Sequence, residues 1–420
     1  MSSPAVPQID ASRLLASFEV LSRIGLTPSG GVNRAAYSEA DREAREVVRG
    51  FMREAGLDVT IDAAGNTIGR RAGRDPTLPP IVLGSHTDSV PEGGHFDGPL
   101  GVLSAIEVAR TLGERGAVTR HPLEVVNFQN EEGGLVGSRA WIGAVREREL
   151  ALVAVSGKTI AEGIAFLGGD ASALDTVRRE PGSIAAYVEL HIEQGSTLER
   201  VGARIGVVVG IVGIRQWEVT VHGVASHAGT TPMEDRRDAL LAAARFIDAV
   251  HRVVTAEPGR QVGTVGRIQA LPGAANVIPG RVILTLELRD LDEERILVLY
   301  ERAVAAATDI AVATGTSFDF RPTLVNPPAP MSERVRSAAA DAATSLGLRA
   351  IEMPSGAGHD AQNMARLGPA GMIFVPSVGG VSHSPREYTR DTDVVNGANV
   401  LLGTVLRLDD GFGAENRGRS

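Results

Sequence analysis

The strongest structural signal in this chain is the stretch IVLGSHTDSVPEGGHFDGPLGVL, residues Ile81 to Leu103. It opens with a short apolar run bounded by a glycine, which predicts a buried strand. The strand delivers His86 and Asp88 at its carboxyl end, and a glycine-containing loop then leads to Asp97 and an apolar helix. Taken alone, the stretch is compatible with an ordinary strand, loop and helix. A histidine and carboxylates gathered by a tight loop at a strand end are also suitable metal ligands.

Similar strands recur along the chain and alternate with helical patterns. Two further apolar strands run directly into Glu131, Glu132 and His191, and a last strand precedes the loop that carries His383. Strands that alternate with helices predict an α/β fold, with a mixed sheet covered by helices on both faces. Ligand sites in such folds gather at the carboxyl ends of the strands, which is where these side chains are expected.

The length of 420 residues exceeds what one hydrophobic core usually supports, so two domains are expected. After about Gly210 the pattern changes to alternating apolar and polar residues, as in half-exposed strands. The order strand, helix, strand, strand, helix then predicts a small α+β insert. We assign residues 1–211 and 329–420 to the domain that carries the candidate metal ligands, and residues 212–328 to the insert.

The composition excludes several kinds of site and partner. The net charge of −9 is spread along the chain, which argues against a nucleic-acid partner. The chain has no cysteine, so any metal must be held by histidine and carboxylate groups. No apolar stretch approaches the roughly 18 residues of a membrane span, and the amino terminus lacks the pattern of a signal peptide. We therefore expect a cytoplasmic protein with no membrane association.

Five side chains form a candidate metal-binding set that offers only nitrogen and oxygen donors. Two divalent ions about 3.5–4 Å apart, bridged by one carboxylate, would need roughly this many ligands. Imidazole and carboxylate groups suit Zn²⁺, with Mn²⁺, Co²⁺ and Ni²⁺ as alternatives. The candidate ligands are His86, Asp97, Glu132, His191 and His383.

The adjacent acidic pair Glu131 and Glu132 adds a further indication. Two neighbouring carboxylates repel each other unless a positive charge is close. An isolated pair of this kind usually belongs to a solvated loop, but this pair follows a buried strand and precedes two glycines. One carboxylate can therefore bind metal while the other transfers protons.

Six motifs occur in order along the chain: HTDSVPEGGHFDGPLGV, NEEGG, ELHIEQG, HAGTTPM, GAGHDA and VSHSPRE. Together they resemble the hydantoinase/carbamoylase amidases, which include N-carbamoyl-L-amino-acid hydrolases, allantoate amidohydrolases and β-ureidopropionases. These belong to the wider group of aminoacylase/carboxypeptidase-type two-metal hydrolases. The resemblance runs from about residue 10 to residue 408. It implies a catalytic metal-binding domain at 1–211 and 329–420, and a dimerisation or lid domain at 212–328.

The resemblance also implies how the five ligands are divided between two metals. Asp97 would bridge the two ions, and His86 and His191 would bind one ion each. Glu132 and His383 would complete the pair of sites.

Further roles follow from the resemblance alone. Glu131 would be the general base and acid, and Asp88 would orient His86. His227 would stabilise the oxyanion and, with Asn276 and Arg289, would contact the substrate; His227 and Asn276 would reach across a homodimer. The remaining residues expected to line the substrate pocket are Gln194, Gly358 and His359.

The expected reaction is hydrolysis of an N-carbamoyl-L-amino acid to the amino acid, ammonia and carbon dioxide. Allantoate amidohydrolase and β-ureidopropionase activities are alternatives that would use the same residues. An aminoacylase or peptidase of the wider group is a further alternative. A catalytically silent binding protein would be expected to have lost Glu131 or a metal ligand, and this chain keeps all of them.

Several residues also have purely structural interpretations. Arg289 could be a salt-bridged strand residue with Asp290 as its partner, and His359 could hold its glycine-rich loop. Trp217 is expected in a hydrophobic core, whereas His121 is expected to face solvent.

Overall fold

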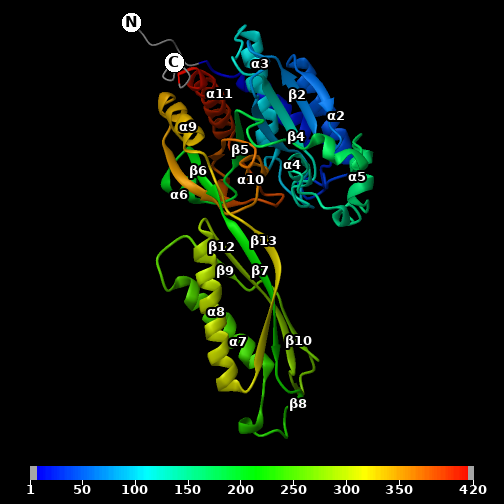
Figure 1. Ribbon diagram of the computed structural model, residues 1–420, viewed down its shortest axis with the longest axis vertical. Coiled ribbons are helices and arrows are strands. Elements are labelled where there is room, and N and C mark those ends of the chain that lie inside the picture. Colours follow the sequence, from blue (N-terminus) through cyan, green and yellow to red (C-terminus); the bar gives the residue numbers. More distant parts are fainter. Residues whose placement is uncertain (1–6, 415–420) are drawn as a thin grey trace. The chain divides into compact units, whose positions relative to one another are not determined.

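The computed structural model describes residues 7–414, which form two compact units. The chain passes from the larger to the smaller unit between Val209 and Gly210 and returns between Ala329 and Pro330. Figure 1 follows this path by colour along the sequence. These limits lie within two residues of the predicted ones. The first six residues, part of the amino terminus in which no signal peptide was recognised, lie outside the described residues.

The larger unit is built on a nine-stranded mixed sheet of order β1-β2-β4-β3-β5-β16-β6-β14, with β15 paired to β6. The pairs β4–β3, β3–β5 and β5–β16 are parallel, whereas the outer pairs β1–β2, β2–β4 and β16–β6 are antiparallel. The parallel centre explains the continuous apolar runs in the sequence, since both faces of these strands are buried. The strands are β1 (Asp58–Ile61), β2 (Thr67–Arg71), β3 (Ile81–His86), β4 (Leu123–Phe128), β5 (Ala186–Ile192), β6 (Ile205–Ile211), β14 (Ala329–Pro330), β15 (Ala350–Ser355) and β16 (Ala370–Val375).

Helices cover both faces of this sheet, which confirms the predicted fold class. Helices α1, α2, α3, α9 and α11 share one hydrophobic core with the sheet, whereas α4 and α10 contact β4, β5 and β16 outside that core. The helices are α1 (Ala11–Ser22), α2 (Glu39–Glu54), α3 (Pro99–Glu114), α4 (Val136–Trp141), α5 (Ile160–Phe166), α6 (Thr197–Val201), α9 (Glu333–Ser345), α10 (Ala361–Met364) and α11 (Asp391–Ala414), with 3₁₀ turns η1 (Glu147–Glu149), η2 (Ala171–Val177) and η4 (Val378–Gly380). None of the described helices has the length and apolar character needed to cross a membrane.

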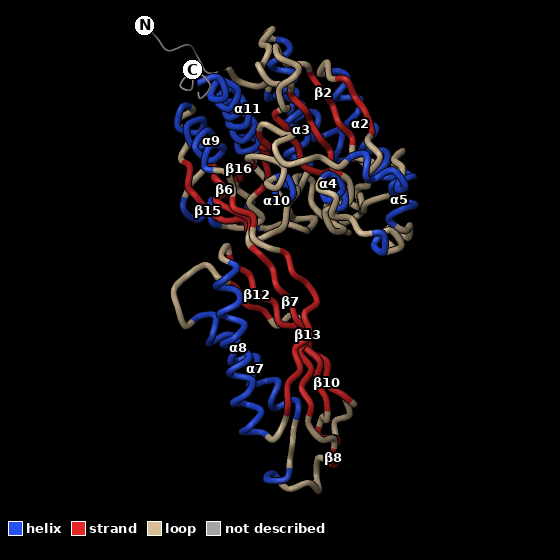
Figure 2. The backbone as a smooth tube through the Cα atoms, in the orientation of Figure 1, coloured by secondary structure: helices blue, strands red, loops and turns tan. Residues whose placement is uncertain are grey.

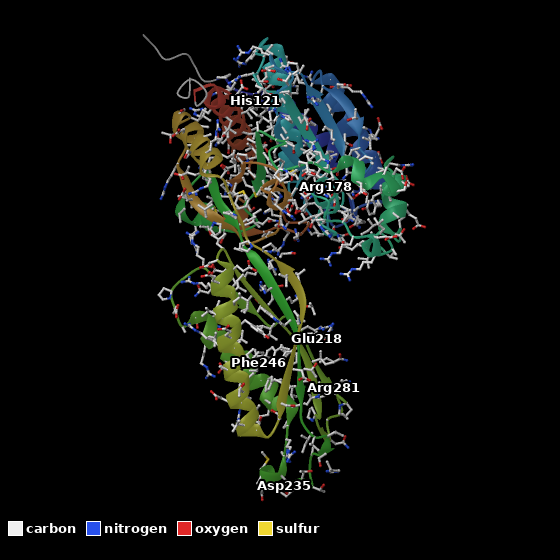
Figure 3. The ribbon with its side chains drawn as sticks, viewed as in Figure 1. His121, Arg178, Glu218, Asp235, Phe246 and Arg281 are labelled. Atoms are coloured by element: carbon white, nitrogen blue, oxygen red, sulfur yellow. The ribbon has the colours of Figure 1, made fainter. Side chains whose placement is uncertain are left out.

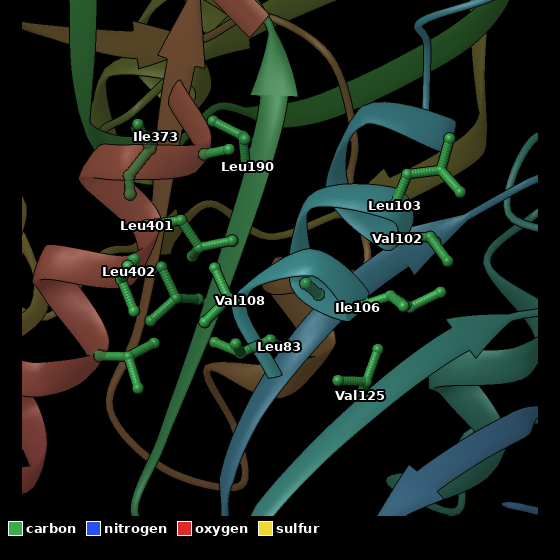
Figure 4. Close-up of a cluster of buried hydrophobic side chains, with 14 of the residues drawn as sticks. Leu83, Val102, Leu103, Ile106, Val108, Val125, Leu190, Ile373, Leu401 and Leu402 are labelled. Atoms are coloured by element: carbon green, nitrogen blue, oxygen red, sulfur yellow. The ribbon is translucent and has the colours of Figure 1, made fainter. Parts of the chain in front are cut away.

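Figure 4 shows how the core fixes the central strands. Val108 of α3 and Leu401 of α11 pack over β5, where Leu190 points into the same core. Leu83 of β3 lies beside them, and all four side chains are fully buried. Alternate residues of the same strands face the opposite side of the sheet. The rigid core therefore holds in place the strand ends that carry His86 and His191.

The smaller unit is an antiparallel sheet covered on one face by two helices, as Figure 2 shows for α7 and α8. The strand order is β10-β12-β7-β13, with β9 paired to β12, and β8 pairs with β11 in a separate ladder. Phe246 of α7, labelled in Figure 3, is fully buried between helix and sheet. Trp217 also lies in this core, as predicted, and stacks on Tyr300 with ring centroids 4.2 Å apart. The elements are β7 (Gly213–His222), β8 (Ser226–His227), η3 (Met233–Asp235), α7 (Ala239–Thr255), β9 (Val262–Thr264), β10 (Ile268–Leu271), β11 (Val277–Ile278), β12 (Arg281–Asp290), α8 (Glu293–Thr314) and β13 (Ser317–Asn326).

Two features of the fold differ from what the sequence indicates. Strand β13 is a full partner of β7 that the sequence pattern does not predict, because its alternation is weak and Pro322 interrupts the register. The expectation that His121 faces solvent is wrong: the residue is buried, and its Nδ1 lies 2.8 Å from the main-chain oxygen of Pro79. Its main-chain N–H donates to Asp409, so His121 fixes the turn before β4 to α11.

Candidate metal centre and active site

The five candidate ligands converge at the carboxyl edge of the large sheet. One group consists of His86, Asp97 and His191, and a second consists of Asp97, Glu132 and His383. Within each group the potential ligand atoms lie within 4.8 Å of one another. Asp97 is common to both groups, as a bridging carboxylate would be. The arrangement therefore offers two adjacent cation positions that share one side chain.

The predicted separation of His86 and His191 onto different metals does not match this geometry. Strands β3 and β5 are parallel neighbours, with Ile81 opposite Ala186 and Leu83 opposite Val188. Continued to the strand ends, this register brings His86 opposite His191, and the two ring centroids are 6.1 Å apart. The parallel pairing of β3 with β5, whose paired residues are 105 positions apart in the chain, thus places both imidazoles in one group.

The main chain orients both imidazole rings. Nδ1 of His86 lies 3.0 Å from the main-chain oxygen of Asp88, and Nδ1 of His191 lies 3.0 Å from that of Ile192. A carbonyl oxygen can only accept, so each Nδ1 carries the proton and each Nε2 faces the centre. This is the tautomer that a metal-binding histidine requires. Nε2 of His191 is buried and faces Oδ1 of Asp97 at 3.3 Å without a well-aligned hydrogen bond to the described residues, which fits a position reserved for a cation.

The loop before α3 is shaped by its closeness to His86. Gly98 has φ +83°, and a Cβ at this position would lie 2.5 Å from Cε1 of the His86 ring. Only glycine accommodates both the left-handed backbone and this close approach. Pro99 then begins α3 with a φ suited to the first helical turn. The glycine therefore allows Asp97, immediately before it, to lie beside the histidine.

Asp97 is held by partners on two loops. Its Oδ2 accepts hydrogen bonds from Nε2 of Gln194 at 2.7 Å and from Oγ of Ser382 at 2.8 Å. Its main-chain N–H donates to Oε1 of Glu387, and Oε2 of Glu387 lies 2.8 Å from the same Ser382 hydroxyl. The predicted pocket residue Gln194 therefore contacts the shared carboxylate directly. Although burial opposes ionisation, His191 lowers the pKa of Asp97 well below its usual value, so this carboxylate stays charged.

Asp88 positions the acidic pair as well as His86. Its carboxylate accepts from the main-chain N–H groups of Glu131 and Glu132, at 3.3 and 3.2 Å. Its contact with the His86 ring is made through the main-chain oxygen, because the carboxylate lies 3.8 Å from Nδ1. Asp88 thus ties together the ends of β3 and β4.

Glu131 lies at the inner end of the acidic pair and is 8% exposed. Its Oε2 is 3.8 Å from Nε2 of His86, within reach of a group bound at the first ligand set. Burial, reinforced by the negative charges of Asp360 and Glu132, raises the pKa of Glu131 well above its usual value. Burial also raises the pKa of Glu132 to about 8. A carboxylate with a raised pKa is suited to accept and return a proton near neutral pH.

The surroundings shift the pKa values of the candidate histidine ligands in opposite directions. Burial lowers the pKa of His86 to about 4. Burial also disfavours the charged form of His191, but the carboxylate of Asp97 outweighs it and raises the pKa to about 9. A hydrogen bond that the His383 ring donates to Asp97 likewise raises the pKa of the half-exposed His383 to about 9. Without a cation, protons on these rings balance the surplus of buried carboxylates, as divalent ions would.

His359 lies behind the centre, on the loop after β15. It is buried, its ring is 4.6 Å from that of His191, and its Nε2 is 2.8 Å from Oγ of Ser355. Gly358 precedes it and packs against Gln362. His359 therefore packs against the His191 ring and holds its own loop, which is one of the two interpretations that the sequence leaves open; its place in the substrate pocket stays a prediction.

The remaining predicted residues lie in the smaller unit, where β8 and β11 bring His227 next to Asn276. His227 pairs with Val277, and the N–H of Ala228 donates to the main-chain oxygen of Asn276 at 2.9 Å. Nδ1 of His227 accepts from the main-chain N–H groups of residues 229 and 230. It is therefore unprotonated, and Nε2 is the donor of the neutral ring.

Arg289 lies on β12 and not on the β8–β11 ladder, and it pairs with Ile214 at the start of β7. Its Nε donates to Oε1 of Glu287 at 2.8 Å, so the strand partner is Glu287 rather than the expected Asp290. Residues two apart on a strand share a face, whereas adjacent residues do not. Arg289 is only partly buried, with its side chain 32% exposed.

Comparisons with known proteins identify the family of this chain. The sequence pattern described as "Peptidase family M20/M25/M40" matches residues 82–407, which is more than half of the chain. The chain belongs to this family. An M20-type catalytic unit accounts for the α/β sheet with an inserted smaller unit.

Relatives place the chain more closely within family M20. An N-carbamoyl-L-amino acid amidohydrolase from Geobacillus stearothermophilus is 43% identical, over 96% of this chain and 100% of the relative. An allantoate amidohydrolase from Bacillus subtilis is 36% identical, over 93% of this chain and 96% of the relative. A solved hydantoinase/carbamoylase-family amidase from Burkholderia multivorans matches with a TM-score of 0.89 and 38% identity, covering 96% of this chain and 99% of that chain. The predicted family is thereby confirmed: this is an M20 amidohydrolase that acts on C–N bonds.

Two supporting residues of this amidase were not recognised from the sequence. Glu387 is 4% exposed and holds the loop of Asp97. Arg45 of α2 is 1% exposed; it donates to the main-chain oxygens of β4 and lies 4.0 Å from the carboxylate of Asp88. Glu387 lies only four residues after His383, so its motif could have signalled it. Arg45 has no local signal, because its burial arises only when α2 packs on the sheet.

Proposed function

We propose that this M20 amidohydrolase hydrolyses N-carbamoyl-L-amino acids to the amino acid, ammonia and carbon dioxide. The observation that carries the proposal is the buried Glu131 beside two ligand groups that share Asp97. The 43% identity to an N-carbamoyl-L-amino acid amidohydrolase over the whole length of that relative supports this substrate.

The donor set fits two divalent cations, with Zn²⁺ as the first expectation and Mn²⁺, Co²⁺ or Ni²⁺ as alternatives. His86, Asp97 and His191 would hold one ion, and Asp97, Glu132 and His383 would hold the other. Bound ions would lower the pKa of a water between them and polarise the ureido carbonyl.

Glu131 would take the proton as water attacks the ureido carbonyl. Its raised pKa allows it to hold this proton and to deliver it to the departing nitrogen. Asp88 supports the step indirectly, because its hydrogen bonds to the main chain of Glu131 and Glu132 fix the loop. The chemistry therefore needs one proton shuttle and no covalent intermediate.

Residues of the smaller unit would bind the substrate. We propose that Nε2 of His227 stabilises the developing oxyanion, and that Arg289 holds the substrate carboxylate through a bidentate pair. We further propose that the chain is a homodimer in which His227 and Asn276 serve the partner's site. Their position in a different compact unit from the metal ligands supports this.

Sharing across a dimer can be tested by complementation. His227→Ala and Glu131→Gln chains should each be nearly inactive, and mixed chains should recover activity in heterodimers with one intact site. Mass measurement of the mixture confirms subunit exchange. Exchange without recovered activity would mean that His227 serves its own chain or no site.

Allantoate amidohydrolase is the second candidate function, favoured by the 36% identical Bacillus subtilis relative. Ammonia release should be measured for carbamoyl amino acids, allantoate and β-ureidopropionate, and amino-acid release for dipeptides, all under the same metal conditions. The proposal expects the highest kcat/KM with a carbamoyl amino acid. Preference for allantoate or for a dipeptide would replace the proposed substrate.

A further inference from the structure

An aliphatic cavity of about 410 Å³ lies directly beside the candidate metal centre, within the larger unit. Asp88 and Glu132 form part of its wall, so it is continuous with the ligand groups. Its volume lies within the roughly 300–1,000 Å³ typical of small-molecule pockets. The other side chains used below are all aliphatic: Val90, Pro91, Leu152, Val153, Val155 and Ile160.

The outer wall of this cavity is a loop that exposes large apolar side chains. Leu152 is 57% exposed, Val153 68% and Val155 75%. These three lie within four consecutive residues beside a catalytic centre, whereas single exposed apolar residues elsewhere on a surface need no explanation. The exposure is concentrated where a ligand would cover it.

The loop has a defined backbone, so the wall does not depend on substrate to form. Val153 bridges Thr159, and the N–H of Ala154 donates to the main-chain oxygen of Lys158 at 2.9 Å. Gly157, with φ +83°, provides the turn between them. Oγ of Thr159 then caps α5, which anchors the carboxyl side of the loop.

The chemistry of the lining selects an apolar occupant. The ionisable side chains among the described wall residues are Asp88, which is held by the main-chain N–H groups of the acidic pair, and Glu132, a candidate ligand. Neither is available to pair with a charged group of a substrate. Two uncharged polar side chains also line the wall: Ser89, whose hydroxyl bonds to the main chain of residues 32 and 34, and Asn130, whose amide donates to Tyr37. A charged or strongly polar group placed among these aliphatic side chains would lose its hydration without compensation.

We propose that this cavity receives the side chain of the substrate amino acid, and that the preferred substrates carry aliphatic or aromatic side chains. The inference rests on the proposed function and narrows its substrate class. Allantoate carries a second polar ureido group instead of an apolar side chain, so it would leave the aliphatic wall uncovered. The loop at 152–155 then acts in specificity and not in the hydrolytic step.

The test compares substrates that differ only in side chain: N-carbamoyl-glycine, -leucine, -aspartate and Nα-carbamoyl-lysine. The wild-type enzyme should favour leucine over glycine by at least about tenfold in kcat/KM, since even one methylene in an apolar pocket is worth about 10–200-fold. Aspartate should be the poorest substrate. Glycine serves as the reference because it places nothing in the cavity.

Two exposed wall residues can be changed without disturbing the core. Val153→Asp and Val155→Asp should each lower kcat/KM for carbamoyl-leucine by about tenfold, leave carbamoyl-glycine within about twofold and improve carbamoyl-lysine relative to leucine. Val118→Asp is the matched control. Val118 is 47% exposed and follows α3, which runs from the catalytic edge back across the sheet.

The outcomes separate this inference from the proposed function. Hydrolysis of carbamoyl-glycine with no preference for leucine would overturn the inference and leave the proposed function standing. Equal losses on glycine and leucine in both wall variants would assign the loop to stability or catalysis. A changed oligomeric mass with an unchanged substrate ratio would show that another copy covers the loop. Absence of activity on every carbamoyl compound would overturn the proposed function, and this inference with it.

Discussion

The carboxyl edge of the large sheet and the β8–β11 ladder of the smaller unit hold their predicted site residues in opposite ways. His86 and His191 are almost fully buried, and the main chain fixes their rings. His227 and Asn276 are exposed, and main-chain groups of the ladder, with the hydroxyl of Thr231, hold them. Buried, like-charged carboxylates are costly to fold, so their retention at the sheet edge indicates a centre completed by cations. The exposed residues of the β8–β11 ladder do not bury charge on folding, and they are suited to contacts formed only with substrate.

The largest effect on activity is expected when the proton-transferring carboxylate is removed from the buried centre. Glu131→Gln should lower kcat by at least about 10²–10⁴-fold, the usual contribution of a general base, with the metal content retained. Glu132→Gln is the matched control on the adjacent residue and should instead weaken metal binding. Steady-state kinetics with elemental analysis distinguishes the two. If Glu131→Gln lost metal and Glu132→Gln lost only turnover, Glu132 would be the base and Glu131 the ligand.

A smaller effect is expected in the substrate-binding residues of the smaller unit. Arg289→Lys keeps the charge but loses the planar fork, and a charge-assisted hydrogen bond contributes about 1.5–3 kcal/mol. KM for carboxylate-bearing substrates should therefore rise about tenfold, with kcat little changed. Arg267→Lys is the control, because Arg267 pairs with Glu218 on an exposed part of the same sheet. An unchanged KM would remove Arg289 from the site.

The smallest expected effect is a pH-dependent stability of the metal-free protein. The pKa of Glu132 is raised to about 8, and those of His191 and His383 to about 9. All three bind more protons folded than unfolded between pH 6.5 and 8, and the two histidines continue to do so up to about pH 9, so the free energy of unfolding falls as pH rises. The lowered pKa of His86 acts in the opposite direction, but only below pH 6.5.

Thermal unfolding with a chelator and with Zn²⁺ measures this effect. Tm of the chelated protein should fall between pH 6.5 and 8.5, and Zn²⁺ should raise Tm more at the higher pH. The expected size is a few degrees, since 1 kcal/mol corresponds to about 2–4 °C. A Zn²⁺ effect that is constant across this range would show that protons and cations do not compete at the centre.

The sequence predicts the local parts of the site and misses those that depend on distant packing. The order of His86, Asp88 and Asp97 within one strand and loop predicts a candidate centre without tertiary information, once similar side chains at the ends of other strands are added. The placement of His86 and His191 in one ligand group depends on the register of β3 and β5, which no local pattern encodes.

The burial of a charged residue also depends on packing that the local sequence does not reveal. Arg45 lies among polar residues of α2 and would ordinarily be placed in solvent, yet it is buried where its side chain reaches the main-chain oxygens at the end of β4. Strand β13 was missed because most of its residues stay exposed and the alternation begun by Phe318 and Phe320 breaks at the register shift after Pro322. Whether such residues are buried depends on tertiary packing, which a local sequence pattern does not reveal.

Counting metal ions in matched variants tests the central claim most directly, namely that Asp97 joins two cation positions. Wild-type protein purified under mild conditions should hold two divalent ions per chain and lose activity reversibly on chelation. His383→Ala should lose one ion, because it contributes to only one ligand group, whereas Asp97→Ala should lose both. A fully active metal-free preparation, or a single ion unaffected by His383→Ala, would contradict the account.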